Sequence, residues 1–284
     1  MKQIGFLGPE GTFSHAAAKK YKKANALSAK LIPKSTFVDL FVSLEANHCE
    51  EILLPIENSV GGSVSGSMAL LTEHHQVTIL SEVVLTIDNF LMGDPKDEGK
   101  TMTDIVSHPQ PLMQCANYLH QHFPNVTLHH AFSTAQAVEM MKKIQEKSDT
   151  RIVSVIGSDA IAQVFNLKIW DKYINDKPNN TTRFLIISKK GATAPTGHDK
   201  TSLIFSTAKD TSGGLYDALG SFAKRDINLS MITSQPTRNA LGEYVFFIDC
   251  EGHCQDKDVK NALEDIQAQS LFFKFLGSYK RETP

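Results

Sequence analysis

The alternation of strand-like and helix-like segments through the first 190 residues constrains the fold most strongly. Short apolar stretches recur between stretches whose apolar residues repeat at helical spacing. The strand-like stretches lie at residues 4–8, 51–57, 77–87, 103–109, 126–132, 151–157 and 182–190, and the helix-like ones at 14–24, 35–46, 62–73, 111–123, 133–147 and 158–166. Such alternation predicts α/β layers built on mainly parallel sheets. Capping boxes are expected at Thr36–Asp39 and Ser133–Gln136.

The pattern changes after residue 188. Residues 189–200, KKGATAPTGHDK, contain two glycines and one proline, lack apolar periodicity, and are interpreted as a linker. Residues 201–284 then follow the order strand, helix, strand, strand, helix, strand, with a turn expected at 236–242. This βαββαβ order is typical of the ferredoxin-like unit. The sequence therefore predicts a first domain over residues 1–188 and a second over 201–284.

Composition narrows the class of protein. The chain has 284 residues, 41% hydrophobic content and a net charge of −2, which favours about two globular domains and gives no sign of a nucleic-acid or membrane partner. No apolar run reaches membrane-spanning length, and the N-terminal run is too short for a signal segment. Four cysteines are too few for a disulfide scaffold, so a cytoplasmic location is expected. The CEGHC stretch (250–254) lacks a second ligand pair, so no metal is expected there.

Four predicted strand ends run into small polar residues that open a helix. These loops are GPEGTFSH (8–15), ENSVGGSVSGS (57–67), FSTAQA (132–137) and IGSDA (156–160). Helix N-termini favour anions, and ligands of open α/β sheets bind beyond the carboxyl ends of strands. Converging loops of this kind would hold a small molecule with more than one carboxylate. The alternative for each loop is that its Ser or Thr only caps the helix backbone.

A fifth polar junction, NNTTRF (179–184), places two hydroxyls and a guanidinium where a loop becomes a strand. Thr182 and Arg183 are adjacent, so in a regular strand they would face opposite ways, and both line one pocket only if the strand starts later or is bulged. Glu57 ends another apolar strand, where a carboxylate needs a partner or solvent. It is either a partner for Arg183 or a substrate hydroxyl, or an acceptor for backbone N–H groups. No GxSxG, Walker or GxGxxG motif is present, which argues against a dehydrogenase or an NTP-using enzyme.

Five motifs, in this order, resemble the prephenate dehydratase family: GPEGTFSHAAA (8–18), PIENSVGGSV (55–64), SHPQPLMQC (107–115), FSTAQA and NNTTRF. The C-terminal part resembles the ACT domain of the monofunctional members. The resemblance covers essentially the whole chain. It implies an α/β fold with a two-lobed catalytic domain like a type II periplasmic binding protein, followed by a ferredoxin-like ACT domain. It also implies conversion of prephenate to phenylpyruvate, carbon dioxide and water without a cofactor.

The resemblance assigns roles to particular residues. Thr182 corresponds to a threonine that meets the departing hydroxyl, and Arg183 would clamp a carboxylate. Glu57 completes the candidate catalytic set. Candidate substrate-binding residues are Asn58, Ser59, Gln114, Gln110, Thr12, Ser14, Ser133, Thr134 and Phe184, the last turning back toward the core. For the hydroxyl and amide residues among them, backbone capping without substrate contact is the alternative.

The second domain resembles one that binds phenylalanine between two subunits. The family's GAL helix start is Gly213–Gly214–Leu215 here, and its ESRP segment is TSQP, so the effector candidates are Gly213, Gly214, Leu215, Ser234, Gln235 and Pro236. The TSQP segment lacks the family's carboxylate and guanidinium, which affects how tightly an effector would bind. A homodimer or homotetramer is expected. Two alternatives stay open: an arogenate dehydratase, and a non-catalytic small-molecule sensor of the same architecture.

Overall fold

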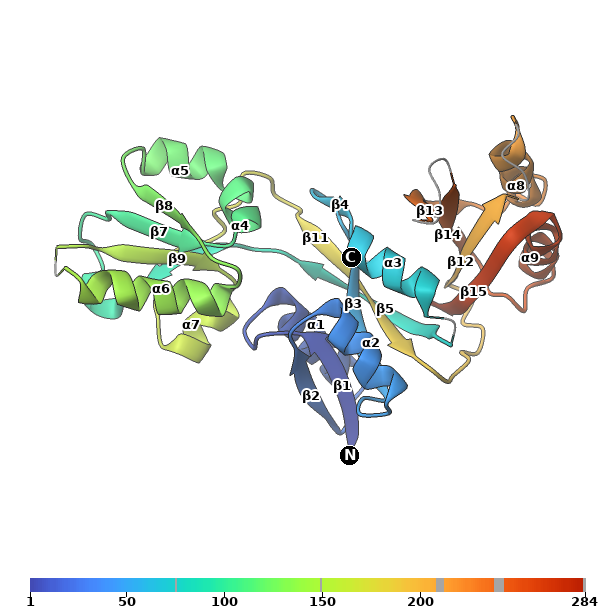
Figure 1. Ribbon diagram of the computed structural model, residues 1–284, viewed down its shortest axis with the longest axis horizontal. Coiled ribbons are helices and arrows are strands. Elements are labelled where there is room, and N and C mark those ends of the chain that lie inside the picture. The colour runs from blue at the N-terminus through green and yellow to red at the C-terminus, as the bar shows by residue number, and fades with distance from the viewer. Residues whose placement is uncertain (75, 149, 208–211, 238–242, 283–284) are drawn as a thin grey trace.

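The computed structural model describes residues 1–74, 76–148, 150–207, 212–237 and 243–282. Figure 1 shows three bodies in a row: a green lobe, a central lobe that contains the N-terminal strand, and an orange and red C-terminal domain. Each body is built on its own β-sheet. The expected two-lobed α/β region followed by a βαββαβ domain is confirmed. None of the described helices is long and apolar enough to cross a membrane.

The central lobe carries a sheet in the order β2-β1-β3-β11-β5, with β4 beside β3. Its strands are β1 (Lys2–Leu7), β2 (Ala29–Lys34), β3 (Glu51–Asn58), β4 (Gly62–Ser63), β5 (Thr78–Thr86) and β11 (Thr181–Ser188), and its helices are α1 (Phe13–Ala24), α2 (Phe37–Glu45) and α3 (Ser65–Glu73). Helix α1 covers one face, where Ala17 and Ala18 pack on Phe6 and Phe184. Helices α2 and α3 cover the other face.

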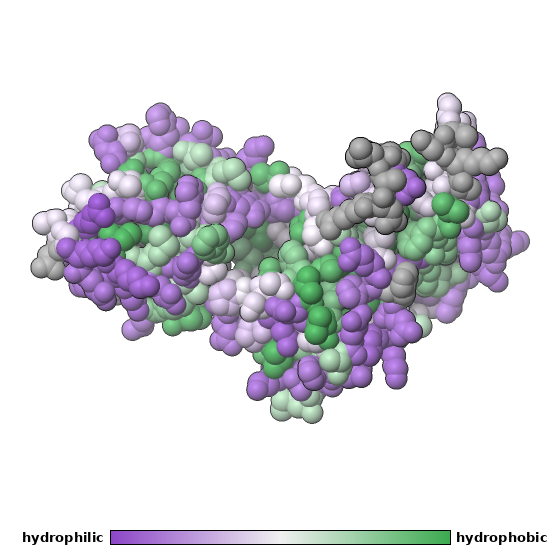
Figure 2. All heavy atoms as spheres, viewed as in Figure 1, coloured by the Kyte–Doolittle hydropathy of each residue, from purple (hydrophilic) through white to green (hydrophobic). Residues whose placement is uncertain are grey.

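The green lobe carries a sheet in the order β10-β6-β9-β7-β8. Its strands are β6 (Phe90–Gly93), β7 (Asp104–Ser107), β8 (Thr127–His130), β9 (Val153–Gly157) and β10 (Lys168–Asp171), and its helices are η1 (Pro95–Asp97), α4 (Pro109–Gln114), α5 (Ala116–His122), α6 (Thr134–Glu146) and α7 (Asp159–Phe165). Helices α6 and α7 pack on one face, and α4 and α5 on the other. The visible surface of this lobe is mostly hydrophilic (Figure 2).

The chain passes between the two lobes twice, from β5 to β6 and from β10 to β11. Strand β11 re-enters the central sheet antiparallel to both β3 and β5, so the expectation of mainly parallel sheets is wrong for this part. Among the described strands, the parallel pairs are β1 with β2 and β3, and β7 with β8 and β9. The return of β11 places residues about 120 positions apart in sequence side by side.

Some helix boundaries differ from the prediction. The helix expected at 111–123 begins at Pro109 and is divided at Cys115 into α4 and α5. The capping box at Thr36–Asp39 is confirmed in both directions. At the start of α6 only half of the box forms, because the Gln136 side chain accepts from the Phe132 N–H.

The C-terminal domain is a four-stranded antiparallel sheet in the order β13-β14-β12-β15. Its elements are β12 (Asp199–Thr207), α8 (Gly214–Ala223), β13 (Leu229–Pro236), β14 (Tyr244–Glu251), α9 (Lys257–Gln269) and β15 (Ser270–Lys280). Strand β12 begins inside the span expected for the linker. Both helices pack on one face of the sheet, through Phe222 and Ile266. Residues 238–242 of the expected turn lie outside the described part of the chain.

The other face of this sheet packs against the central lobe. Ile204, Phe247 and Leu276 of the C-terminal domain share one buried cluster with Ile79 and Leu185 of the lobe. The approach of β15 to β5 is close: a Cβ atom at Gly277 would lie 2.6 Å from the carbonyl oxygen of Ile79. Gly277 also has a φ of 134°, a conformation that favours glycine. Gly277 therefore allows the backbones of β15 and β5 to approach closely at this interface.

A buried lysine crosses this interface. Lys274 of β15 donates its ammonium to the carbonyl oxygens of Leu71 and His74 at the end of α3. Burial lowers the pKa of Lys274 to about 8. The charged form is thus disfavoured by folding, and the penalty disappears as the pH rises from about 8 toward the unfolded value of about 10.4. We expect the unfolding midpoint of the wild type to rise relative to that of Lys274→Met across this window.

The measurement is thermal unfolding of both proteins at several pH values between 7 and 10. Lys280→Met, at an exposed position at the end of the same strand, is the matched control, because that side chain is not buried by folding. Curves for the wild type and Lys274→Met that stay parallel over this range would contradict the expectation.

Candidate active site

The site is organised by the pairing of β11 with β3. Thr182 lies opposite Asn58, and Arg183 lies opposite Glu57. Strand β11 has already begun at Thr181, so successive side chains alternate between the faces of the sheet. Thr182 and Asn58 therefore share the face that α1 covers. Arg183 and Glu57 share the opposite face.

Asn58 is the centre of a buried hydrogen-bond cluster. Its amide nitrogen lies 2.9 Å from Thr182 Oγ1 and 2.7 Å from Asn180 Oδ1. Its amide oxygen accepts from the backbone N–H groups of Val60 and Gly61, at 3.0 and 2.7 Å. These four groups, two from the adjacent loop and two from the distant 180–182 segment, thus fix the position of the Asn58 side chain. The sequence places Asn58 at the end of an apolar stretch, and in the structure it is the last residue of β3.

The hydroxyl of Thr182 is oriented by this cluster. The side chain is 9% exposed, and its oxygen accepts the proton that Asn58 donates. A hydroxyl has one proton to give and two lone pairs to accept with. Among the hydrogen bonds of the described residues, none uses the Thr182 proton as a donor. The arrangement leaves this proton for a group that is not part of the protein.

Asn180 belongs to the same cluster, although the sequence did not single it out as a site residue. It is 2% exposed, and its own amide nitrogen has no hydrogen-bond partner among the described residues. A buried donor without a partner costs free energy. The signal that could have found it is its place in the NNTTRF stretch. Ser59 ties this stretch to β3, since its hydroxyl accepts from the Thr181 N–H and donates to the Asn179 carbonyl.

Helix α4 of the green lobe carries two of the candidate residues, Gln110 and Gln114. A Cβ atom at Gly61 would lie 3.3 Å from Asn58 Oδ1 and 3.7 Å from the Gln110 amide nitrogen, so Gln110 faces the Asn58 loop across the two lobes. Gln114 accepts from the Asn89 amide at 3.1 Å, beside the first crossover. Gln110 thus lies near the loop that follows Asn58, and Gln114 lies beside the first crossover.

The hydroxyl residues at the other helix starts bond to the backbone. Thr12 caps α1 by accepting from the His15 N–H, and it donates to the carbonyl of Pro9 at 2.9 Å. Ser133 caps α6. The Thr134 methyl group packs against Gly157. Ser14 is buried beside Thr12. This geometry favours the capping alternative for Thr12 and Ser133.

The loop before α1 also joins the two lobes. Ser158, at the start of α7, donates its hydroxyl to the Gly11 carbonyl at 2.6 Å. The Gly11 N–H donates to His15 Nδ1, and the His15 ring stacks on Phe6. Burial, together with Lys19, lowers the pKa of His15, which keeps its ring neutral as this acceptor requires. The Ser158–Gly11 hydrogen bond therefore joins the two lobes at the loop before α1.

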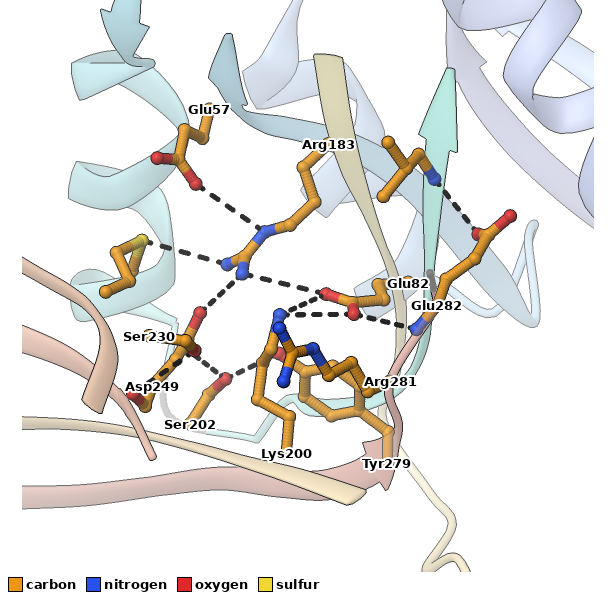
Figure 3. A network of polar contacts seen from close by, with 12 residues as sticks. Glu57, Glu82, Arg183, Lys200, Ser202, Ser230, Asp249, Tyr279, Arg281 and Glu282 are labelled. Carbon is orange, nitrogen blue, oxygen red and sulfur yellow. Dashed lines mark hydrogen bonds and ion pairs between the residues drawn. The ribbon is translucent and has the colours of Figure 1, made fainter. Parts of the chain in front are cut away.

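Arg183 does not face the Thr182 cluster, which corrects the expectation that both line one pocket. Its guanidinium points across the interface, where Nη1 lies 2.6 Å from Asp249 Oδ2 and 3.6 Å from Glu82 Oε2 (Figure 3). The Arg183 Nε lies 4.0 Å from Glu57 Oε2, so Glu57 takes the role of a partner for Arg183. The reason is the strand alternation: Arg183 is one residue beyond Thr182 on a strand without a bulge of its own.

Phe184 belongs to the core. It is 2% exposed and packs in the cluster beneath α1, so its place among the substrate-binding candidates is also corrected. The sequence argument that it turns back toward the core agrees with this position.

A cavity of about 300 Å³ lies beside the crossovers. It is lined by residues 86–88 and by several residues between Tyr173 and Asn180.

The effector candidates of the C-terminal domain lie at one end of its strands. Strands β12 and β13 both run antiparallel to β14, so their carboxyl ends lie at the same end of the sheet. Gly213 caps α8 there with a φ of 92°, a conformation that favours glycine. Gly214 and Leu215 begin that helix, and Ser234, Gln235 and Pro236 end β13. The structure thus brings the two segments to the same end of the domain.

Comparison with known proteins decides the family. A sequence profile described as Prephenate dehydratase matches residues 4–192, and one described as ACT domain matches residues 201–268. The chain belongs to the prephenate dehydratase family. The prephenate dehydratase of Methanocaldococcus jannaschii is 36% identical over 280 residues, which cover 98% of each chain. The C-terminal domain of this family member is accordingly called the ACT domain below.

Solved structures agree with this assignment. A prephenate dehydratase from Arthrobacter aurescens, in complex with L-Phe, is 32% identical with a TM-score of 0.87, and the match covers 98% of this chain and 90% of that one. A protein described as GqqA, a novel type of quorum quenching acylase, is 26% identical with a TM-score of 0.84, over 99% and 100% of the two chains. The architecture alone therefore does not fix an activity, and the site residues have to carry that argument.

Proposed function

We propose that this member of the prephenate dehydratase family converts prephenate to phenylpyruvate, carbon dioxide and water, and that it thereby acts as a carbon–oxygen lyase. The observation that supports the proposal best is the Thr182 hydroxyl, which Asn58 holds at 2.9 Å with its proton available. Thr182 lies in a motif of the family. In the proposal its hydroxyl meets the ring hydroxyl of prephenate, and the departure of that hydroxyl needs a hydrogen-bond donor.

The chemistry explains why a weak acid is sufficient. The bond between the ring and its carboxylate breaks, its electron pair enters the ring, and the ring hydroxyl leaves with its bonding pair. Aromatisation of the ring drives both events. A proton passed to the departing oxygen gives water. A preorganised donor aimed at a developing negative charge lowers such a barrier by about 3–4 kcal/mol. In the proposal, Thr182 donates a hydrogen bond to the departing oxygen and relays a solvent proton to it, so its own hydroxyl is restored, and Asn58 and Asn180 hold it in place.

The two carboxylates of prephenate would be held mainly by neutral donors. Since the Arg183 guanidinium is paired with Asp249, it is not free to bind them. The remaining donors around the cluster are amides, hydroxyls and the N–H groups of helix starts. In the proposal Gln110 approaches the substrate from the green lobe and Ser59 shapes the loop beside it. Helix starts favour anions without a charged side chain.

We also propose the domain division and the regulation. Residues 1–188 would form the catalytic domain, 189–200 the linker, and 201–284 the ACT domain that binds phenylalanine. The free edge of β13, with Ile232 46% exposed, supports pairing with a second copy as a homodimer or homotetramer. The protein would act in the cytoplasm, and it would need no metal or cofactor for this chemistry.

Purified protein incubated with prephenate should yield phenylpyruvate, measured by the absorbance of its enolate in alkali. Adding phenylalanine should inhibit the reaction. Arogenate, tested in parallel, separates the first alternative, because turnover of arogenate alone would make the protein an arogenate dehydratase. Tight binding of prephenate without turnover would instead favour a sensor. Absence of turnover with either substrate contradicts the proposed activity.

A further inference from the structure

Four buried charges form a cluster between the catalytic lobe and the ACT domain. Arg183 and Glu82 come from the lobe, and Lys200 and Asp249 come from the ACT domain (Figure 3). The side chains of all four are at most 11% exposed. Two cations face two carboxylates, so the cluster is neutral as a whole. Charges this deeply buried depend on their partners, since an unpaired one is strongly destabilising.

Within the cluster, Arg183 depends mainly on Asp249. The 2.6 Å contact between Arg183 Nη1 and Asp249 Oδ2 is its shortest to a carboxylate. Burial alone would lower the pKa of Arg183, but Asp249 and Glu82 raise it above its usual value. Glu82 already accepts two bonds from the Lys200 ammonium, at 2.9 and 3.1 Å. A displacement of Asp249 would therefore move Arg183 or force it to pair with Glu82 or Glu57.

The lobe side of this contact leads directly to the candidate active site. Arg183 follows Thr182 in β11, and consecutive Cα atoms are about 3.8 Å apart. The strand is paired on both sides, with β3 and β5, so it moves as one piece with few internal degrees of freedom. Asn58 holds Thr182 from one neighbouring strand at 2.9 Å. A shift of the Arg183 backbone would therefore change the direction of the Thr182 hydroxyl.

The ACT side of the contact leads to the effector candidates. Asp249 lies on β14 and accepts a hydrogen bond from Ser202 of β12. Its strand pairs along its length with β13, whose end carries Ser234. A second contact comes from the same strand, since Thr233 Oγ1 lies 3.2 Å from Ser63 Oγ of β4. Movement of β13 upon effector binding would thus reach both Asp249 and the loop that follows Asn58.

We propose that Asp249 is a positioning residue for the reaction: through its ion pair with Arg183 it transmits the state of the ACT domain to Thr182. The proposal rests on the proposed function and deepens it, because it names the contact that links effector and site. Arg183 has two nearby carboxylates that can replace Asp249, which gives the contact two alternative arrangements. A ligand shifts such an equilibrium when it favours one arrangement over the other.

The test compares wild type with Asp249→Asn, which removes the charge and keeps the size. Two quantities are measured for each: binding of phenylalanine by calorimetry, and the ratio of kcat for prephenate without and with saturating phenylalanine. Allosteric coupling typically gives about a 5–150-fold effect. We expect a ratio in this range for wild type and a ratio near one for Asp249→Asn, with phenylalanine still bound. A residue needed only for folding would not separate binding from inhibition.

Glu251→Gln is the matched control. Glu251 lies on the same strand, and its carboxylate pairs with Arg281 within the ACT domain at 2.6 Å, so the inhibition ratio should stay that of wild type. Ser202→Ala is a milder second variant, because it releases Asp249 from β12 and keeps all four charges. Ser202→Ala should also lower the inhibition ratio, by less than Asp249→Asn does. If Asp249→Asn does not fold or does not bind phenylalanine, the ratio of Ser202→Ala tests the role of Asp249.

The outcomes separate the two levels of inference. An inhibition ratio of wild-type size in Asp249→Asn and in Ser202→Ala, with phenylalanine bound, overturns the role of Asp249 and leaves the proposed function intact. Wild-type protein that does not turn over prephenate overturns the proposed function itself. If the inhibition ratio also falls to near one in the Glu251→Gln control, removal of any charge from β14 abolishes inhibition. That result also overturns the specific role of Asp249.

Discussion

Thr182→Ala is expected to lower kcat for prephenate by about 10²–10⁴-fold, the usual contribution of a positioned proton donor. The physical reason is the loss of the hydroxyl whose oxygen Asn58 fixes at 2.9 Å. KM should change much less, because this contact strengthens as the leaving hydroxyl develops charge. Thr182→Ser keeps the hydroxyl and should retain much more activity than the alanine variant. Steady-state kinetics with prephenate give both parameters.

Thr182→Val separates chemistry from packing. Valine keeps the branched shape and the strand preference of threonine and removes only the hydroxyl. It should lose as much activity as the alanine variant and keep a thermal midpoint close to that of wild type. Thr181→Val removes the neighbouring hydroxyl on the same strand and is the matched control, which should stay near wild type. Wild-type rates for Thr182→Val would mean that Thr182 is not the donor.

The sequence predicted the architecture better than the pairing of its strands. Strand–helix alternation predicted α/β layers, the βαββαβ order predicted a ferredoxin-like domain, and the family resemblance implied the two lobes. Strands β2, β6 and β10 were missed, because β2 and β10 are short edge strands and β2 contains Pro33. The antiparallel return of β11 could not be predicted from local preference either. It depends on contacts with β3 and β5, about 100 residues earlier in the chain.

The dependence on contacts distant in the sequence also explains which site residues were predicted correctly and which were not. Thr182 and Asn58 stand in recognisable motifs, and the structure brings them together. Arg183 was placed with Thr182 because a charged residue next to a polar loop resembles a ligand for an anion, whereas in the structure it faces Asp249. Side chains alternate between the two faces of the sheet along β11, so Arg183 lies on the face opposite to Thr182. What the sequence could not supply was the partner there, since Asp249 lies in another domain.

Arg183→Met is expected to lower the free energy of unfolding by about 3–5 kcal/mol, the cost of breaking a buried ion pair by removing one partner. Asp249 is left as a buried carboxylate without its cation, and Glu82 keeps only Lys200. Methionine fills part of the volume of the arginine stem, so the loss of charge should dominate. Denaturant unfolding, followed by circular dichroism, measures the change. Lys168→Met is the matched control, because it breaks a half-exposed pair with Glu98 and should cost at most about 1 kcal/mol.

The double variant Arg183→Met with Asp249→Asn distinguishes a lost ion pair from lost packing. If the cost arises from the stranded carboxylate, neutralising Asp249 in the Arg183→Met background should recover part of the stability. The same change in wild type should be destabilising, because the guanidinium loses its shortest contact to a carboxylate. The two effects of Asp249→Asn would then have opposite signs, and their difference is the coupling of the pair. Equal costs in both backgrounds would mean that Arg183 and Asp249 contribute independently, and the interdomain contact would then be packing rather than an ion pair.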